Sequence, residues 1–159
     1  MSSPVTVRVT HRYNASAERV FDAWLTPSQA GRFFFATRTG NIMRCDIDPR
    51  VGGSFFVTDR RPTADGDESV MDLDHRGTYV EIDRPHRLVF DFAVEPYDHH
   101  TTRVAIDFVA QGPTACEVTL THEMGDSGMA HAMQQQARQG WAKMLEKLER
   151  ELFPKRYAL

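Results

Sequence analysis

Cysteines are scarce in this sequence, and long apolar runs and an excess of basic residues are missing, which excludes several classes of protein. Its two cysteines, Cys45 and Cys116, are too few for the disulfide framework of a small secreted domain. No apolar run approaches the ~20 residues that span a bilayer, so we expect no membrane span. The net charge is −3, so no basic surface is expected and no nucleic-acid partner is predicted.

The composition that remains is typical of one globular domain. The 159 residues are 41% hydrophobic and 26% charged, which is enough apolar material for a core without disulfides or metals. We expect residues 1–159 to form a single domain with its core over about 5–153. The first four residues lack the charged-then-apolar build of a signal peptide, so we expect a cytoplasmic protein.

The first part of the chain predicts a strand followed by two short helices. Apolar and polar residues alternate over 5–13, which is the period of a half-buried strand. Ser16 is a good N-cap for a helix whose apolar residues recur at spacings of three and four. Thr26 precedes a proline and, three residues on, a glutamine, which predicts a second helix with a capping box. Three phenylalanines at 33–35 are expected to end that helix.

Six further strands are predicted after residue 40. Residues 60–74 contain five acidic residues and little apolar content, which predicts a long, flexible, solvated loop. Elsewhere apolar and charged residues alternate, as expected for an antiparallel sheet with one wet face. The predicted strands lie at about 43–47, 54–59, 75–83, 86–95, 102–111 and 114–122.

The C-terminal region predicts one long helix. Asp126 or Ser127 caps it and Pro154 stops it after about Phe153. Because the sheet cannot hide one face by itself, this helix is expected to cover it. The predicted fold is therefore α+β, a curved antiparallel sheet of about seven strands wrapped round the long C-terminal helix. The apolar stripe of the helix is Met129, Met133, Ala137, Trp141, Met144, Leu145, Leu148 and Leu152.

Three motifs, in order along the chain, resemble those of one protein family. Residues 48–53 (DPRVGG) are similar to its D-x-R-x-G-G stretch, and residues 77–88 (GTYVEIDRPHRL) resemble its G-x-y-x-E-I-x-x-P-x-R-L strand pair. Residues 140–141 (GW) match its terminal helix. The chain thus resembles the activator-of-heat-shock-chaperone-ATPase homologue-like family of the START-like, birch-pollen-allergen-like (SRPBCC) superfamily. The resemblance covers about residues 5–153 and implies a helix-grip fold.

The resemblance also implies a hydrophobic cavity between the sheet and the C-terminal helix. The residues alone favour an ordinary core, and Gly140 allows either a close approach of helix and sheet or space for a ligand. The family usually has a tryptophan where this chain has 33–35, which changes the shape of the cavity. The expected lining residues are Phe33, Tyr79, Phe90, Phe92, Ile106, Phe108, His122, Met133, Trp141 and Met144.

The seven histidines predict neither a metal site nor a catalytic pair. None has the spacing of a zinc motif, and the adjacent His99 and His100 point to opposite sides of an extended chain. We therefore expect no metal and no cofactor. His11 and His122 share the apolar parity of their strands, but pairing of the first and last strands places them too far apart for one proton relay.

The direction in which Glu81 points is open at this stage. An inward Glu81 would be a buried carboxylate with a raised pKa, and an outward one a charge on the sheet surface. We expect a structural ion pair, with Arg87 or Arg103 as its partner. No acid–base pair emerges, so no catalytic residue is assigned.

Three functions follow as hypotheses. The first is a small soluble protein that binds an apolar or aromatic small molecule in the cavity. The second, implied by the resemblance, is an interaction module whose partner is a chaperone or another protein, although we do not expect here the additional domain that such activators carry. The third is a cyclase- or hydrolase-type enzyme on the same fold. The sequence is compatible with a monomer and with a homodimer.

Overall fold

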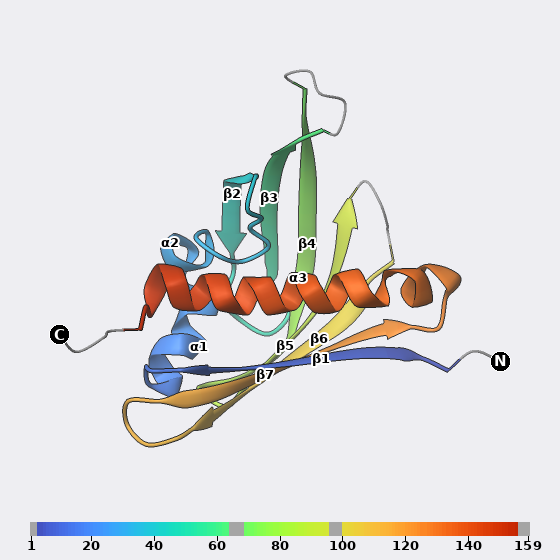
Figure 1. Cartoon of the computed structure of the whole chain (residues 1–159). Helices are drawn as coiled ribbons and strands as arrows, with labels where there is room; N and C mark the ends of the chain where they lie inside the picture. Colours follow the sequence, from blue (N-terminus) through green and yellow to red (C-terminus); the bar gives the residue numbers. More distant parts are fainter. Residues whose placement is uncertain (1–2, 64–68, 96–99, 156–159) are drawn as a thin grey trace.

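A computed structural model describes residues 3–63, 69–95 and 100–155. Figure 1 shows one antiparallel sheet with a long helix lying across one of its faces. The elements are β1 (Val5–Tyr13), α1 (Ala17–Leu25), α2 (Pro27–Ala30), β2 (Asn41–Ile47), β3 (Ser54–Pro62), β4 (Val70–Asp83), β5 (Arg87–Glu95), β6 (Thr102–Ala110), β7 (Cys116–Gly125) and α3 (Gly128–Leu152).

The seven strands lie in the order β1-β7-β6-β5-β4-β3-β2. Strands β2 to β7 follow each other as antiparallel neighbours, and β1 closes the row by pairing with β7. The side chain of Ser16 caps α1 and that of Ser127 caps α3, as expected from their residue types. The predicted α+β fold, a sheet wrapped round a C-terminal helix, is confirmed.

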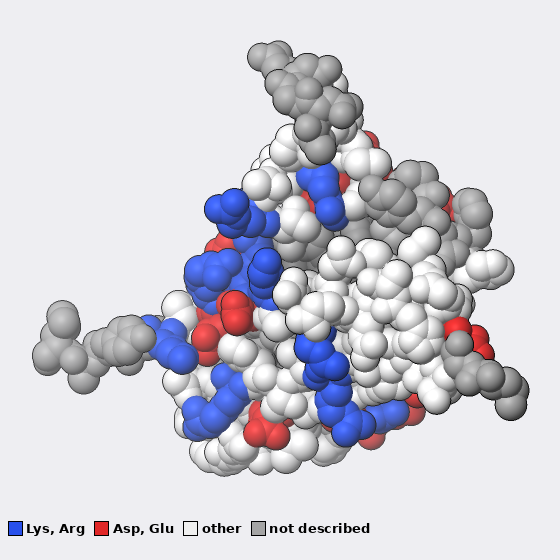
Figure 2. All heavy atoms as spheres, turned by 45° about the vertical axis from the view of Figure 1, so that its right-hand side comes forward, with Lys and Arg blue, Asp and Glu red and all other residues white. Residues whose placement is uncertain are grey.

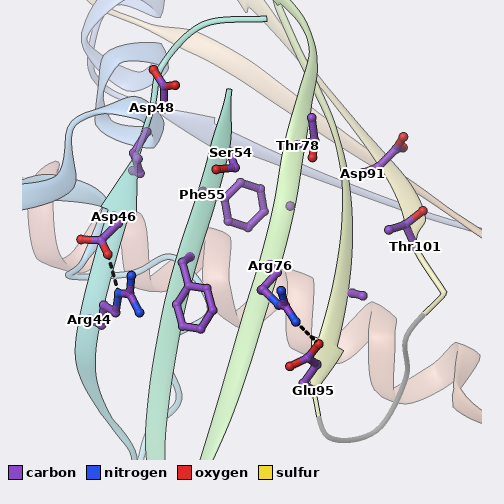
Figure 3. A pocket seen from close by; sticks show the side chains of 14 residues that line it. Arg44, Asp46, Asp48, Ser54, Phe55, Arg76, Thr78, Asp91, Glu95 and Thr101 are labelled. Carbon is purple, nitrogen blue, oxygen red and sulfur yellow. Dashed lines mark hydrogen bonds and ion pairs between the residues drawn. The ribbon is translucent and has the colours of Figure 1, made fainter. Parts of the chain in front are cut away.

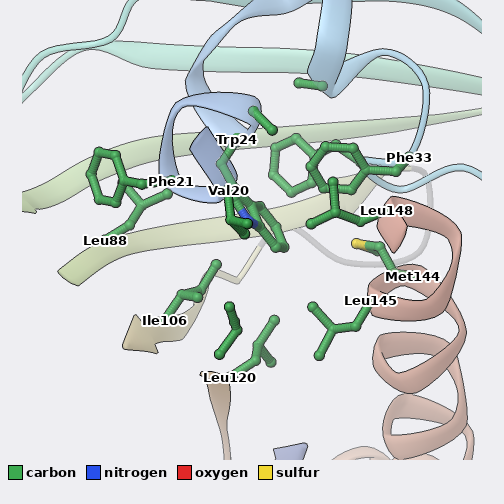
Figure 4. Packing of buried hydrophobic residues seen from close by; sticks show 14 of the residues in the cluster. Val20, Phe21, Trp24, Phe33, Leu88, Ile106, Leu120, Met144, Leu145 and Leu148 are labelled. Atoms are coloured by element: carbon green, nitrogen blue, oxygen red, sulfur yellow. The ribbon is translucent and has the colours of Figure 1, made fainter. Parts of the chain in front are cut away.

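The core fills the space between the inner face of the sheet, the two short helices and the second half of α3 (Figure 4). Trp24 of α1 and Phe33 pack edge to face with ring centroids 4.9 Å apart. Tyr13 at the end of β1 donates a hydrogen bond of 2.8 Å to the backbone oxygen of Leu145. The hydrogen bond of Tyr13 fixes the second half of α3 against β1.

Apart from the buried Ala130, the first half of α3 is largely exposed, and the prediction that its methionines join the buried stripe is wrong. Met129 is 66% exposed and Met133 is 40% exposed. The predicted stripe used steps of four residues from Met129 to Trp141, and each step turns the helix about 40° further than a full turn. After three steps Met129 lies about 120° round the helix from Trp141, so it faces away from the sheet.

Gly140 has neither of its predicted roles. A β-carbon at this position would have nothing within 4 Å, so no close approach of helix and sheet requires glycine. The residue is exposed on the helix, and it leaves no space towards the core.

The predicted loop over residues 60–74 is wrong at both ends, because β3 continues to Pro62 and β4 starts at Val70. Arg60 donates to both carboxylate oxygens of Asp72 across the strand pair, at 2.8 and 3.2 Å. Opposite charges facing each other on the wet side of a sheet stabilise a ladder that has few apolar residues. Residues 64–68, the middle of the predicted loop, lie outside the described residues.

The predicted capping box of the second helix is wrong as well. Thr26 occupies the N-cap position of α2, but its side chain makes no capping hydrogen bond. Its hydroxyl instead donates to the backbone oxygen of Asp22 at 2.7 Å, in the last turn of α1. The helix is therefore only one turn long and ends at Ala30, before the three phenylalanines.

Candidate ligand site at the inner face of the sheet

Nine of the ten predicted lining residues are buried, and Met133 is the exception. They do not all face one space. Phe108 packs on Phe21 of α1 with ring centroids 5.0 Å apart, in the same part of the core as Ile106 (Figure 4). Phe33 belongs to this part too, through its contact with Trp24. These residues form an ordinary core rather than a ligand site.

Three other predicted residues do come together, from β5, β7 and α3. The ring of Phe92 lies 5.4 Å from that of His122 and 5.9 Å from that of Trp141. Trp141 Nε1 donates a hydrogen bond of 3.0 Å to His122 Nδ1. Because an indole N–H can only donate, His122 Nδ1 carries no hydrogen, and Nε2–H is free to donate to Thr102 Oγ1 at 2.7 Å. Both nitrogens of this buried imidazole are thus satisfied.

Two residues that the sequence analysis missed, Phe35 and His75, complete this group. Their rings are stacked, with centroids 4.1 Å apart and planes inclined by 14°. The ring of Phe35 also lies 5.3 Å from Phe92 and 5.8 Å from Trp141. We call this set of side chains the histidine–aromatic cluster; it consists of Phe35, His75, Phe92, His122 and Trp141.

Phe35 has an unusual backbone conformation. Its φ is 57°, and among the described residues it is the one residue other than glycine with a positive φ. Bulky side chains rarely adopt this left-handed region, since the β-carbon crowds the backbone. Tertiary contacts must therefore hold Phe35 in this conformation. Its ring contacts within the cluster contribute the free energy that offsets the backbone strain.

The segment after Phe35 is anchored to a buried carboxylate. Asp59 of β3 is fully buried, and its Oδ2 accepts hydrogen bonds from Thr37 Oγ1 at 3.1 Å and from Arg61 Nε at 3.2 Å. The backbone N–H of Gly40 donates to Thr37 Oγ1 at 3.1 Å. Residues 31–40 therefore run from α2 to this anchor, with Phe35 between the two fixed ends.

Both histidines of the cluster are uncharged at neutral pH. Burial lowers the pKa of His75 to about 4, although the carbonyls of Val57 and Leu73 and the charge of Asp74 act in the opposite direction. Burial likewise lowers the pKa of His122 to about 4. The cluster consequently presents neutral aromatic surface and no charge.

A hollow of about 720 Å³ lies on the opposite face of the sheet from α3 (Figure 3). Its floor is made by β2 to β5, and it is polar. Arg44 pairs with Asp46, and Arg76 pairs with Glu95. Its arginines therefore already have carboxylate partners, and the ion pairs are exposed to water, where each contributes little. We assign this surface to the wet face of the sheet.

Glu81 points outward, as a charge on the surface of the sheet. Its Oε2 lies 3.5 Å from Arg87 Nε, while Arg87 Nη1 donates to Asp107 at 2.7 Å. The predicted ion pair is confirmed with Arg87, whereas the alternative partner Arg103 pairs with Asp91. A bulge between Tyr79 and Glu81 adds a residue to β4, so the two side chains lie on opposite faces although the residues are two positions apart.

The histidines of β1 and β7 do not lie together. His11 lies opposite Val118 and His122 opposite Val7 in the pairing of β1 with β7, so the two histidines are far apart as predicted. Burial raises the pKa of Cys45 and of Cys116 to about 11, so neither thiol is activated. Within residues 3–63, 69–95 and 100–155, no three His, Cys, Asp or Glu side chains gather as metal ligands. His99 lies outside those residues.

The architecture and the inner-face cluster together define a helix-grip α+β domain. The chain belongs to the family described as "Activator of Hsp90 ATPase homolog 1-like protein", whose sequence profile matches residues 14–152. This confirms the family to which the three motifs pointed, within the START-like superfamily. A comparison with curated proteins returns no match.

Solved structures share the fold at low sequence identity. A protein from Chromobacterium violaceum superposes with a TM-score of 0.78 at 20% identity, covering 96% of this chain and all of its own. An HSP90 activator from Plasmodium falciparum has a TM-score of 0.68 at 20% identity, covering 96% of this chain and 99% of its own. A Staphylococcus aureus protein of unknown function has a TM-score of 0.71 at 14% identity, covering 94% and 93%. At these identities the likeness shows the fold alone.

None of the helices in the described part of the chain has the length and apolarity required to cross a membrane.

Proposed function

We propose that this protein binds a neutral apolar or aromatic small molecule between the sheet and α3, at the histidine–aromatic cluster. The observation that carries the proposal is the meeting of five uncharged rings from β4, β5, β7, α3 and the segment after α2. The cluster lies where α3 changes from its exposed first half to its buried second half, which begins at Trp141. A ligand at this boundary would have the apolar rings of the cluster as its walls.

The strength of such binding follows from the area buried. A two-ring aromatic ligand that buries roughly 200 Å² of apolar surface gains about 5 kcal/mol at ~25 cal/mol per Å². Because association itself costs free energy, the dissociation constant from this term alone is no tighter than roughly 0.2 mM. Ring-on-ring contacts add about 0.5–1.5 kcal/mol for each well-oriented pair. Binding assays therefore need probe concentrations that reach the millimolar range.

The test is a calorimetric titration with 2-naphthol, a neutral two-ring probe. Wild type is expected to bind one equivalent, and Phe92→Leu to bind at least fivefold more weakly, because it removes a ring of the cluster while keeping apolar volume. Met133→Leu is the matched control, since this residue is exposed and lies outside the cluster. Binding that is absent in wild type at millimolar probe, or equal in the two variants, contradicts the proposal.

A second candidate, a chaperone-interaction module, is favoured by a surface feature. Residues 127–137 at the start of α3 contain no charged side chain, and the exposed Met129 and Met133 lie among them. Figure 2 shows a broad uncharged area on the side of the molecule turned forward there. The resemblance to an HSP90 activator in fold is consistent with this use.

The two candidates respond to different substitutions. Met129→Glu combined with Met133→Glu is expected to abolish any stimulation of an Hsp90 ATPase while leaving 2-naphthol affinity unchanged. If purified Hsp90 shows no stimulated ATPase activity with wild type, the second candidate fails and the first is unaffected.

A further inference from the structure

We propose that the ring of Phe35 occupies the ligand's own position and that the ligand is a planar, uncharged aromatic molecule which displaces this ring from the face of His75. The inference rests on the proposed function, because it names the class of ligand and the group that the ligand replaces. It concerns one residue of this chain, Phe35, and the stacking contacts that its ring makes.

The first support is that Phe35 is held in a conformation its backbone does not favour. Its φ of 57° suits glycine or asparagine and is strained for a phenylalanine. Backbone strain at Phe35 raises the free energy of the ligand-free protein, and this strain is released when Phe35 leaves its conformation. Displacing the ring of Phe35 therefore costs a ligand less free energy than displacing the ring of an unstrained residue.

The second support is the geometry of the contacts that Phe35 makes. Its ring is nearly parallel to two others, at 4.1 Å and 14° to His75 and at 4.2 Å and 24° to Phe34. Such stacking accepts any flat ring of similar size, whereas a flexible alkyl chain cannot reproduce it. The space that Phe35 fills therefore selects for planar aromatic ligands.

The third support is the position of Phe35 in the chain. It is the outermost of three successive phenylalanines, at 6% exposure against 0% for Phe33 and 1% for Phe34. It lies midway along residues 31–40, which form neither helix nor strand and are anchored at their far end to Asp59. Rotation of Phe35 out of the core thus moves this short segment and leaves both of its ends in place.

The absence of charge in the ligand follows from the walls. The two imidazoles of the cluster are neutral at pH 7, because burial lowers the pKa of each. The nearest buried carboxylate on β3, Asp59, already accepts hydrogen bonds from Arg61 and Thr37. The charges of Arg61 and Asp74 act on His75 with opposite signs, and Arg61 is already paired with Asp59. A charged ligand would therefore lose its hydration without gaining an unpaired cation in return.

The test compares Phe35→Gly with wild type in titrations with 2-naphthol. Glycine adopts a φ of 57° without strain, so this variant removes the ring and preserves the backbone. At least tenfold tighter binding is expected, because the probe no longer has to expel the ring. Phe108→Ala is the control: it also removes a buried ring, but against Phe21 and outside the cluster, and its affinity is expected to equal that of wild type. Thermal unfolding confirms that each variant is folded.

A measurement on wild type keeps the proposal testable if Phe35→Gly does not fold. Ring protons of Phe35 and His75 are close enough for an NMR cross-relaxation signal in the ligand-free protein. This signal is expected to vanish when 2-naphthol saturates the site, while the corresponding signal between Phe21 and Phe108 persists.

The outcomes separate this inference from the proposed function. Equal affinities of Phe35→Gly and wild type, or a Phe35–His75 signal that persists at saturation, would overturn the displacement of Phe35 and leave ligand binding standing. If neither wild type nor Phe35→Gly binds 2-naphthol, both the displacement of Phe35 and the proposed function are overturned. If Phe35→Gly binds 1-octanol tenfold more tightly than wild type does, as it is expected to bind 2-naphthol, the inference that the ligand is planar is contradicted.

Discussion

Gly40 and Gly140 illustrate how the same residue type has opposite consequences at two positions. A β-carbon at residue 40 would overlap Asp59 Oδ1 and Thr37 Oγ1, and Asp59 is fully buried and held by two hydrogen bonds. A β-carbon at residue 140 meets nothing. Gly40 is therefore required by packing at the anchor of the 31–40 segment, whereas Gly140 only lowers the helix propensity of α3.

Substitution by alanine is expected to separate the two glycines. Gly40→Ala should lower the free energy of unfolding by about 1–3 kcal/mol, because Asp59 cannot move without breaking its hydrogen bonds. Gly140→Ala should raise it by about 0.5–1 kcal/mol through helix propensity alone. Urea denaturation measures both, and a Gly40→Ala protein as stable as wild type would contradict the close packing at Asp59.

The two buried histidines make stability depend on pH. Their pKa is about 4 in the folded protein and about 6.5 in an unfolded chain, so the unfolded state binds more protons between these values. Stability is therefore complete above pH 6.5 and falls as the pH drops towards 4. Below pH 4 both states are protonated and these two groups cause no further loss.

Replacing one histidine should remove its share of this effect. Between pH 7 and 4.5, wild type is expected to lose roughly 2–3 kcal/mol more stability than His122→Gln, since about two pH units lie between the unfolded pKa and 4.5. Urea denaturation at a series of pH values measures the difference. Parallel pH profiles of the two proteins would mean that His122 is not buried in its neutral form.

At the scale of elements, the sequence predicts the sheet best where side chains alternate in polarity. The strands of Val5–Tyr13, Arg87–Glu95 and Thr102–Ala110 were predicted nearly to their ends, because each presents apolar residues to the core at every second position. The ends of β3 and β4 were missed because cross-strand ion pairs replace the apolar alternation there.

The candidate site was only half predictable for a related reason. Phe92, His122 and Trp141 lie at positions whose strand or helix parity points inward, and they were predicted. His75 was not predicted, because it begins the part of β4 next to the expected loop. Phe35 was not predicted either, because a run of three phenylalanines does not indicate which of them has a positive φ. Their contact joins residues forty positions apart and depends on the tertiary fold.

The extended β3–β4 pair gives a prediction at this scale. Leu73 is 3% exposed although it lies in the region expected to be a solvated loop. Leu73→Ala should therefore lower the free energy of unfolding by about 2–4 kcal/mol, as for other buried leucines. Val70→Ala is the control, because this residue of the same strand is 56% exposed. This substitution should lower the free energy of unfolding by less than about 1 kcal/mol. Equal effects of the two substitutions would contradict the inward position of Leu73.

At the scale of the whole molecule, the long helix has two different surfaces. Its second half completes the core with α1 and β1, and its first half stands exposed beside the sheet (Figure 1). The histidine–aromatic cluster lies at the boundary between these halves, at Trp141. The fold thus combines an end of α3 that is packed into the core with an end that is largely exposed, and the proposed function places the ligand at the boundary between them.

The most direct test of ligand binding is a native mass spectrum of the protein with 2-naphthol at millimolar concentration, compared with the mass after denaturation. The proposed function predicts one bound equivalent on the folded protein, lost on denaturation and strongly reduced in Phe92→Leu. A folded protein whose mass stays unchanged across the probe concentrations would contradict it, and would assign the cluster to the core alone.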